Sequence, residues 1–180
     1  MLALLRAYKK YDPSVRSLVE VLLLYPGVKA LFIHRMAHAL FRLRVPFIPR
    51  ALSEFGRFIT GIELHPGAVV GSEVVFDHGM GVVVGETAVI GNRVLIYQGV
   101  SLGGTSLGKN RRHPVIGDCV VLGAGAKILG NITIGEGSRI GANSVVVKDV
   151  PAGSTVVGIP GKIIVRRVEP GKELDHEHIS

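Results

Sequence analysis

Large apolar side chains recur at every sixth position over most of residues 64 to 146, and glycine directly follows many of them. A six-residue period fits neither a helix, which repeats every 3.6 residues, nor a strand buried on one face, which repeats every two. It is typical of a parallel β-helix, in which short strands alternate with corners and each coil buries its neighbour. The repeated residues are Leu64, Val70, Phe76, Val84, Ile90, Ile96, Leu102, Ile116, Leu122, Ile128, Ile134, Ile140 and Val146.

A second position in each hexapeptide strengthens this prediction. The fourth residue after most of the repeated apolar residues is small or apolar, so we expect two inward-facing side chains per hexapeptide. A repeat of this length also excludes a generic β-rich domain in which the spacing is accidental. These second residues are Ala68, Val74, Ala88, Val94, Val100, Val120, Ala126, Ile132, Ser138 and Ser144.

The spacing is interrupted twice, and both interruptions contain histidine. The step from Phe76 to Val84 is eight residues and contains His78. The step from Leu102 to Ile116 is fourteen residues and contains a loop, rich in glycine and charge, that ends at His113. Irregular segments on a rigid scaffold commonly carry function, so both are candidate site segments.

Residues 1 to 60 have a helical pattern. We expect a first helix that begins with Asp12 as N-cap and Pro13 at its first turn and ends before Pro26-Gly27. Residues 28–43 and 51–59 are predicted to form a second and a third helix. Together they would cover the open end of the solenoid.

The composition limits the functional classes. The formal net charge of +7 suits an anionic ligand, but basic residues do not alternate with aromatic ones as in nucleic-acid platforms. No signal peptide or apolar stretch of membrane-spanning length is evident, so we expect a soluble cytoplasmic protein. The single cysteine, Cys119, lies in the repeat and is interpreted as structural.

Three further histidines are interpreted as structural. His34 and His38 stand four residues apart, but Arg35 occupies the position where a zinc protease motif has glutamate. His65 precedes Pro66 at the first predicted corner. We therefore expect no metal site.

Four blocks of this sequence are distinctive: DHGMGVVVGETAVI from Asp77, QGVSLGGT from Gln98, RHP from Arg112 and GAGAKILG from Gly123. They closely resemble serine O-acetyltransferases of the hexapeptide acyltransferase family. The resemblance implies a left-handed parallel β-helix and acetyl transfer from acetyl-CoA to the hydroxyl of L-serine for cysteine biosynthesis. It also implies a homotrimer with active sites between neighbouring coils, and it leaves a dimer of trimers open because the helical region is short.

The resemblance also implies catalytic residues. His78 would be the general base, since imidazole titrates near neutral pH. Glu63, where the family has aspartate, would orient that imidazole, although a merely solvated Glu63 remains an alternative. His113 would contact the substrate or stabilise the charge of the tetrahedral intermediate.

Substrate contacts follow from the same resemblance. Asp12 and Asp77 would bind the ammonium group of serine, and Arg112 its carboxylate through a two-pronged ion pair. The alternative for Arg112 and His113 is a basic loop that only attracts anions.

Acetyl-CoA would lie in a groove between coils, gripped at small residues and with lysines near its phosphates. Thiolate is a good leaving group, so we expect direct transfer without an acyl-enzyme. The residues that match the family's coenzyme positions, or that could meet the phosphates, are Gly104, Thr105, Ala124, Ala142, Lys148 and Lys162.

The expected organisation is a helical region of residues 1–60, a left-handed β-helix acetyltransferase domain of residues 61–167 and a tail of residues 168–180. Many family members end in isoleucine, which inserts into O-acetylserine sulfhydrylase, whereas this chain ends in Ser180. That partner is therefore doubtful. Two other functions stay open: a sugar or xenobiotic O-acetyltransferase of the same fold, and a non-catalytic trimeric scaffold.

Overall fold

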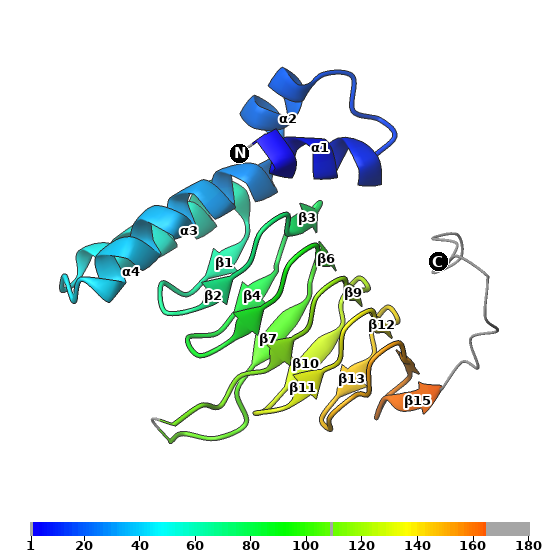
Figure 1. Cartoon of the computed structure of the whole chain (residues 1–180). Coiled ribbons are helices and arrows are strands. Elements are labelled where there is room, and N and C mark those ends of the chain that lie inside the picture. The colour runs from blue at the N-terminus through cyan, green and yellow to red at the C-terminus, as the bar shows by residue number, and fades with distance from the viewer. Residues whose placement is uncertain (1, 109, 165–180) are drawn as a thin grey trace.

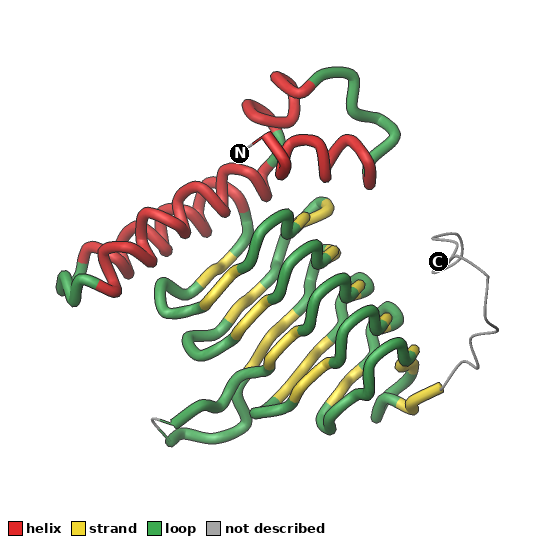
Figure 2. The backbone as a smooth tube through the Cα atoms, in the orientation of Figure 1, coloured by secondary structure: helices red, strands yellow, loops and turns green. Residues whose placement is uncertain are grey.

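The computed structural model describes residues 2–108 and 110–164. Four helices lie at one end of a stack of β-coils (Figure 1), and short strands alternate with turns along each coil (Figure 2). Within the described residues, no helix combines the length and the apolar character that crossing a bilayer requires. The mainly β fold class predicted from the six-residue period, a parallel β-helix with a helical cap, is confirmed.

The helical cap differs in detail from the prediction. Its helices are α1 (Leu2–Tyr11), α2 (Leu18–Leu24), α3 (Pro26–Arg42) and α4 (Ile48–Thr60). The prediction of Asp12 as an N-cap is wrong, because α1 ends before it and Ser17 caps α2 by accepting a hydrogen bond from the Glu20 amide. Pro26 does not simply end a helix but occupies the first turn of the next one, where its missing N–H costs nothing.

The coils form a three-sided prism of parallel sheets. Sheet A has the strand order β1-β4-β7-β10-β13, sheet B has β11-β8-β5-β2, and sheet C has β15-β14-β12-β9-β6-β3. Each strand pairs with the equivalent strand of the next coil, as Glu63 does with Val83 and Val83 with Ser101. Among the strands of the described residues, only the pair β14–β15 is antiparallel.

The strands are two or three residues long. Their bounds are β1 (Glu63–Leu64), β2 (Val69–Val70), β3 (Val75–Asp77), β4 (Val83–Val84), β5 (Val89–Ile90), β6 (Leu95–Tyr97), β7 (Ser101–Gly103), β8 (Val115–Ile116), β9 (Val121–Leu122), β10 (Lys127–Leu129), β11 (Thr133–Ile134), β12 (Arg139–Ile140), β13 (Val145–Val146), β14 (Thr155–Val157) and β15 (Lys162–Ile164).

The core of the prism consists of the two residues predicted to face inward in each hexapeptide. All of the repeated apolar residues except Val70 are buried, and so are all ten second-position residues, including Ser138 and Ser144. Ser138 satisfies its hydroxyl by donating a hydrogen bond to the Pro151 carbonyl at 2.9 Å, which makes a polar group acceptable there.

The two interruptions of the period both lie at corners of the prism. Residues 78–82 connect β3 to β4, and residues 104–114 connect β7 to β8. The additional residues therefore extend away from the coil. The strands that follow them still pair with the previous coil, as β8 does with β5 at Ile116 and Ile90. The rigid stack thereby holds two irregular segments at defined places.

Candidate active site

The predicted site residues gather mainly at two corners of the prism. We call the turn from sheet C to sheet A the CA corner; its first coil contains residues 78–82. We call the turn from sheet A to sheet B the AB corner; it contains residues 85–88 in the second coil and 104–114 in the third. The strands of sheet A separate the two corners in every coil.

His78 protrudes from the CA corner. Its backbone is left-handed, with φ of 55°, and its side chain is 77% exposed. The same left-handed backbone occurs at Glu73, Arg93 and Cys119, which also lie in turns between strands, so it is a feature of the corners of this solenoid. The imidazole Nε2 lies 3.9 Å from Oδ1 of Asp77, so a carboxylate and a base face the same open space.

The helical cap brings Asp12 to the same corner. Ser14 donates to Oδ1 of Asp12 from its backbone N at 2.8 Å and from its hydroxyl at 2.6 Å, and Tyr25 donates to Oδ2 at 2.5 Å. The Ser14 hydroxyl and then the Tyr25 hydroxyl lower the pKa of Asp12, with a smaller electrostatic contribution from His78. Asp12 is therefore an ionised carboxylate close enough to His78 to sense its charge.

Glu63 begins β1, one coil before Val83, and its carboxylate is engaged by helix α4. Its Oε1 lies 3.4 Å from Arg50 and its Oε2 lies 3.6 Å from Arg57, and Glu54 bridges the same two arginines. Among the described residues, no hydrogen bond joins Glu63 to His78. The carboxylate is thus anchored by cations from the cap.

His113 lies in the AB corner, where it is buried. Nδ1 of the imidazole accepts a hydrogen bond from the Thr87 amide at 3.2 Å and lies 2.9 Å from the Thr87 hydroxyl. Burial lowers the pKa of His113, and the charge of Arg112 lowers it further. A neutral ring that accepts at Nδ1 carries its proton on Nε2, so His113 presents an N–H donor.

Gly85 makes room for that ring, because a Cβ at Gly85 would overlap the ring atoms of His113. The Thr87 hydroxyl also accepts hydrogen bonds from the backbone N of Arg112 at 3.1 Å and of His113 at 3.2 Å. Residues 85–87 thereby hold the end of the long loop against the second coil. Thr87 supports the site, but the sequence analysis did not single it out; its place in the matched GETA block was the available signal.

The side chain of Arg112 is 28% exposed and is held at both ends of its guanidinium group. One nitrogen donates to Glu86 at 3.1 Å and the other donates to the Gly108 carbonyl at 3.0 Å. The guanidinium group is thus fixed within the AB corner beside His113. Glu86, which the sequence analysis did not assign, is its ionic partner.

The residues expected to contact the coenzyme are divided between the same two corners and sheet C. Gly104 and Thr105 open the exposed loop of the AB corner, and Lys148 follows β13 at that corner of a later coil. Ala124 and Ala142 stack at the CA corner, where the Asn143 amide donates to the Ala124 carbonyl at 2.7 Å. Lys162 lies apart on β15, opposite Val157.

The structure therefore brings Asp12, Asp77 and His78 together, and Arg112 and His113 together, but at different corners of one chain. His78 is exposed at its corner, whereas His113 is buried and Arg112 is 28% exposed.

The other three histidines of the described residues pack against the surrounding chain. The ring Nδ1 of His65 accepts from the Gly67 amide at 3.0 Å, and His38 bonds the Pro66 carbonyl at 2.8 Å. His34 is 4% exposed, and its Nδ1 has no hydrogen-bond partner within the described part of the chain. Burial lowers the pKa of His34 to about 4.

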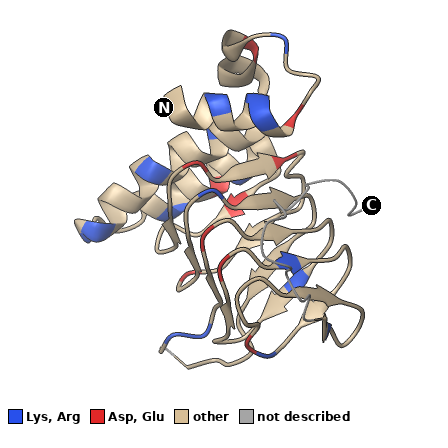
Figure 3. Ribbon diagram, turned by 45° about the vertical axis from the view of Figure 1, so that its right-hand side comes forward, with Lys and Arg blue, Asp and Glu red and all other residues tan. Residues whose placement is uncertain are grey.

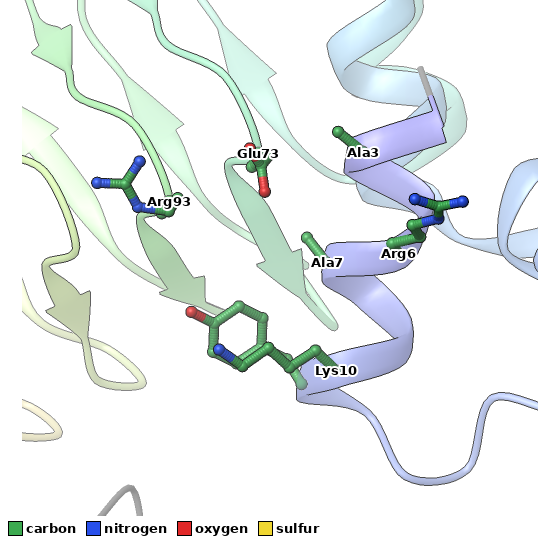
Figure 4. Close-up of a pocket in the computed structure, with 7 residues that line it drawn as sticks. Ala3, Arg6, Ala7, Lys10, Glu73 and Arg93 are labelled. Carbon is green, nitrogen blue, oxygen red and sulfur yellow. The ribbon is translucent and has the colours of Figure 1, made fainter. Parts of the chain in front are cut away.

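A cavity of about 330 Å³ lies away from both sets of residues, between α1 and the sheet B to sheet C turns. Figure 4 shows Arg6 and Lys10 on α1, with Glu73 and Arg93 on the neighbouring coils. The described residues that line the cavity include none of the predicted site residues. In the view of Figure 3, basic and acidic residues are interspersed over the cap and the coils.

The fold and the site define a hexapeptide-repeat transferase. Residues 113–148 match the family model described as "Bacterial transferase hexapeptide (six repeats)". This stretch covers the coils from His113 to Lys148.

More extensive similarity identifies the family. A serine acetyltransferase from Synechococcus elongatus is 57% identical over 171 residues, which cover 93% of this chain and 69% of the relative. A solved soybean serine acetyltransferase complexed with serine aligns with a TM-score of 0.87 and 48% identity over 91% of this chain. A solved serine acetyltransferase in complex with CoA aligns with a TM-score of 0.85 and 40% identity over 90% of this chain. The chain spans 67% of the length of each of these solved chains. The chain belongs to the serine acetyltransferase family.

Proposed function

We propose that this chain transfers the acetyl group of acetyl-CoA to the hydroxyl of L-serine and forms O-acetyl-L-serine, a precursor for cysteine biosynthesis. The observation that carries the proposal is the match to a curated serine acetyltransferase over 93% of the chain, which includes both corner sets. The exposed imidazole of His78 between Asp77 and Asp12 supports the chemistry, because a serine hydroxyl needs a base before it can attack.

In the proposed reaction, His78 takes the hydroxyl proton of serine while the oxygen attacks the thioester carbonyl carbon. The C–O bond forms as the carbonyl π electrons move to oxygen, giving a tetrahedral oxyanion. The oxyanion then collapses, the C–S bond breaks, and the proton on His78 passes to the departing CoA thiolate. Glu63 would orient the imidazole, as the third member does in other histidine-based systems. No step requires a metal or an acyl-enzyme.

The charged groups around His78 suit the two charged ends of serine. Asp12 and Asp77 would receive the ammonium group, and Arg112 would pair with the carboxylate. The N–H of His113 would donate to the carboxylate or to the oxyanion. Because Arg112 also contacts Glu86 at 3.1 Å, substrate binding would add a second carboxylate to an arginine that is already oriented.

A homotrimer would unite the two corners, with the CA corner of one protomer against the AB corner of the next. A mixture of His78→Ala and His113→Ala chains tests this arrangement, because hybrid trimers would contain some sites with both histidines. We expect activity to return on mixing after dissociation and reassembly. A mixture as inactive as its components would show that both histidines act within one chain.

A dimer of trimers would involve the helical cap. Apolar side chains line a cavity of about 380 Å³ on α2, α3 and α4, and their exposure favours association. The lining includes Leu22, Leu23, Phe32 and Ile59. The tail, with the Ser180 that bears on the sulfhydrylase as a partner, lies outside the described residues.

For the coenzyme we propose a groove that uses Gly104 and Thr105 of one protomer and Ala124 and Ala142 of its neighbour, with Lys148 and Lys162 near the phosphates. The solved relative in complex with CoA supports a coenzyme site in this fold. We place the reaction in the cytoplasm. We also divide the chain into a helical region (1–60), an acetyltransferase domain (61–167) and a tail (168–180).

The deciding experiment mixes the purified chain with acetyl-CoA and L-serine and follows the release of free thiol. We expect turnover with serine and much less with homoserine or galactosides. Preference for a galactoside would favour a sugar O-acetyltransferase instead. No turnover with any acceptor would favour the non-catalytic scaffold.

A further inference from the structure

Two tyrosines of the helical cap connect Asp12 to β3, the strand that ends directly before His78. Tyr8 lies on α1, and its hydroxyl accepts a hydrogen bond from the Phe76 amide at 3.1 Å and donates to the Phe76 carbonyl at 3.4 Å. Phe76 immediately precedes Asp77, the last residue of β3, and His78 follows that strand directly. Tyr8 is 1% exposed, so these two bonds satisfy a hydroxyl that has no access to water.

The second tyrosine, Tyr25, packs against Tyr8 and hydrogen-bonds to Asp12. The ring of Tyr25 meets the ring of Tyr8 edge to face, with centroids 5.5 Å apart and an interplanar angle of 79°. Such edge-to-face pairs are favourable because of the aromatic quadrupole. The Tyr25 hydroxyl then donates to Oδ2 of Asp12 at 2.5 Å.

The backbone of Tyr25 is restricted as well. Tyr25 is the last residue before Pro26, and a residue before proline is confined to extended conformations. Its φ of −73° and ψ of 121° fall in that region. The ring of Tyr25 is therefore fixed by proline on one side and by Tyr8 on the other, and its hydroxyl reaches Asp12 from a defined direction.

From this arrangement we infer that Tyr25 is a positioning residue for the acceptor ammonium group: it holds the Asp12 carboxylate in register with His78, and Tyr8 ties both to β3. The inference rests on the proposed function, in which Asp12 receives the ammonium of serine. It adds a residue to which neither the sequence analysis nor the resemblance assigned a role.

The hydrogen bonds to Asp12 leave room for a substrate. A carboxylate offers about four lone-pair positions, and Ser14 and Tyr25 together supply three donors. One lone pair of Oδ2 thus remains for the ammonium group. The charged groups that act on this pair of residues are His78 near Asp12 and Glu20 near Tyr25.

Tyr25→Phe is the direct test, because it removes the hydroxyl and keeps the ring against Tyr8. We expect KM for serine to rise about fivefold to tenfold, given the strength of a hydrogen bond to a charged group and the partial solvent exposure of Asp12. KM for acetyl-CoA and the thermal midpoint should stay close to wild type. Ser14→Ala, which removes one donor to Oδ1 on an exposed turn, should act in the same direction.

Tyr11→Phe is the matched control. Tyr11 directly precedes Asp12, and its hydroxyl makes no hydrogen bond within the described ranges. A second control changes the acceptor: 3-hydroxypropanoate has the hydroxyl and the carboxylate of serine but no ammonium group. Acetylation of this acceptor, measured at high enzyme concentration, should be equally fast with wild type and Tyr25→Phe.

The outcomes separate this inference from the proposed function. If wild type does not acetylate serine, the proposed function fails and the inference fails with it. If wild type is active but Tyr25→Phe keeps its serine KM within twofold of Tyr11→Phe, only the positioning role is overturned. A parallel loss with serine, 3-hydroxypropanoate and acetyl-CoA would also overturn it, because that pattern indicates general misfolding.

Discussion

Gly27 lies where helix α3 approaches β3, and its replacement by alanine should separate the cap from the first coil. A Cβ at Gly27 would overlap the Tyr8 hydroxyl and would lie 2.8 Å from Cβ and 3.0 Å from the carbonyl oxygen of Phe76. The Phe76 carbonyl oxygen belongs to the backbone and the Phe76 Cβ is bonded to it, so these two atoms cannot rotate away. Gly27→Ala must therefore either shift α3 or displace Tyr8 from its bonds to Phe76.

Gly27→Ala changes the free energy of unfolding through two destabilising effects and one stabilising effect. Overpacking a buried contact costs about 1–3 kcal/mol. Leaving a buried hydroxyl or backbone group without its partner costs about 1–3 kcal/mol more. The higher helix propensity of alanine stabilises the folded state by less than about 1 kcal/mol at this early helical position. We expect a net loss of about 3 kcal/mol, which corresponds to a fall of roughly 6–12 °C in Tm for a chain of this size.

The assay is thermal and urea unfolding at one fixed protein concentration, because assembly also contributes to stability. Gly108→Ala is the control, since a Cβ there meets nothing within 4 Å. A second control combines Tyr8→Phe with Gly27→Ala. Tyr8→Phe removes the hydroxyl oxygen that the new Cβ at position 27 would overlap. The double variant should therefore lose less stability than the two single variants lose in sum. If Gly27→Ala unfolds within about 2 °C of Gly108→Ala, the contact between α3 and β3 is not as tight as argued.

Three further predictions concern catalysis and pH. His78→Ala should lower kcat by about three orders of magnitude or more while the far-ultraviolet spectrum and Tm stay unchanged; near-normal turnover would dismiss His78 as the base. Glu63→Gln should lower kcat by a smaller factor and Glu63→Asp by less than Glu63→Gln, whereas equal loss in both variants would assign Glu63 to its ion pairs with Arg50 and Arg57 rather than to orientation of the base. His34 has a folded pKa of about 4 against an ordinary value of 6.5, so the unfolded chain binds the proton more tightly; its contribution to stability is complete above pH 6.5 and falls by about 3 kcal/mol as the pH drops toward 4. Urea titrations between pH 7 and pH 4 should show this slope in wild type and a shallower one in His34→Leu, and identical slopes would contradict it.

The β-helix was predictable from the sequence because its order is local. Each hexapeptide pairs with an equivalent hexapeptide of the next coil, so a residue such as Ile116 or Ile134 reports its own burial through spacing alone. The two interruptions of the period could be located for the same reason. The helical cap was less predictable, because Asp12 and Pro13 satisfy the rules for a helix start but Asp12 is used by Ser14 and Tyr25 instead.

The amino-acid sequence by itself determined the coil, its inward-facing residues, the two irregular segments and the similarity that identifies the family, since each of these depends on residue type and spacing along one chain. Only the tertiary structure decided which of these residues meet. It placed Asp12 beside His78, Glu63 between two arginines of α4, and His113 at another corner of the prism. The physical reason is that long-range contacts depend on how the cap packs on the first coil, and no periodic pattern encodes the hydrogen bond from Tyr25 to Asp12 or that from Tyr8 to Phe76.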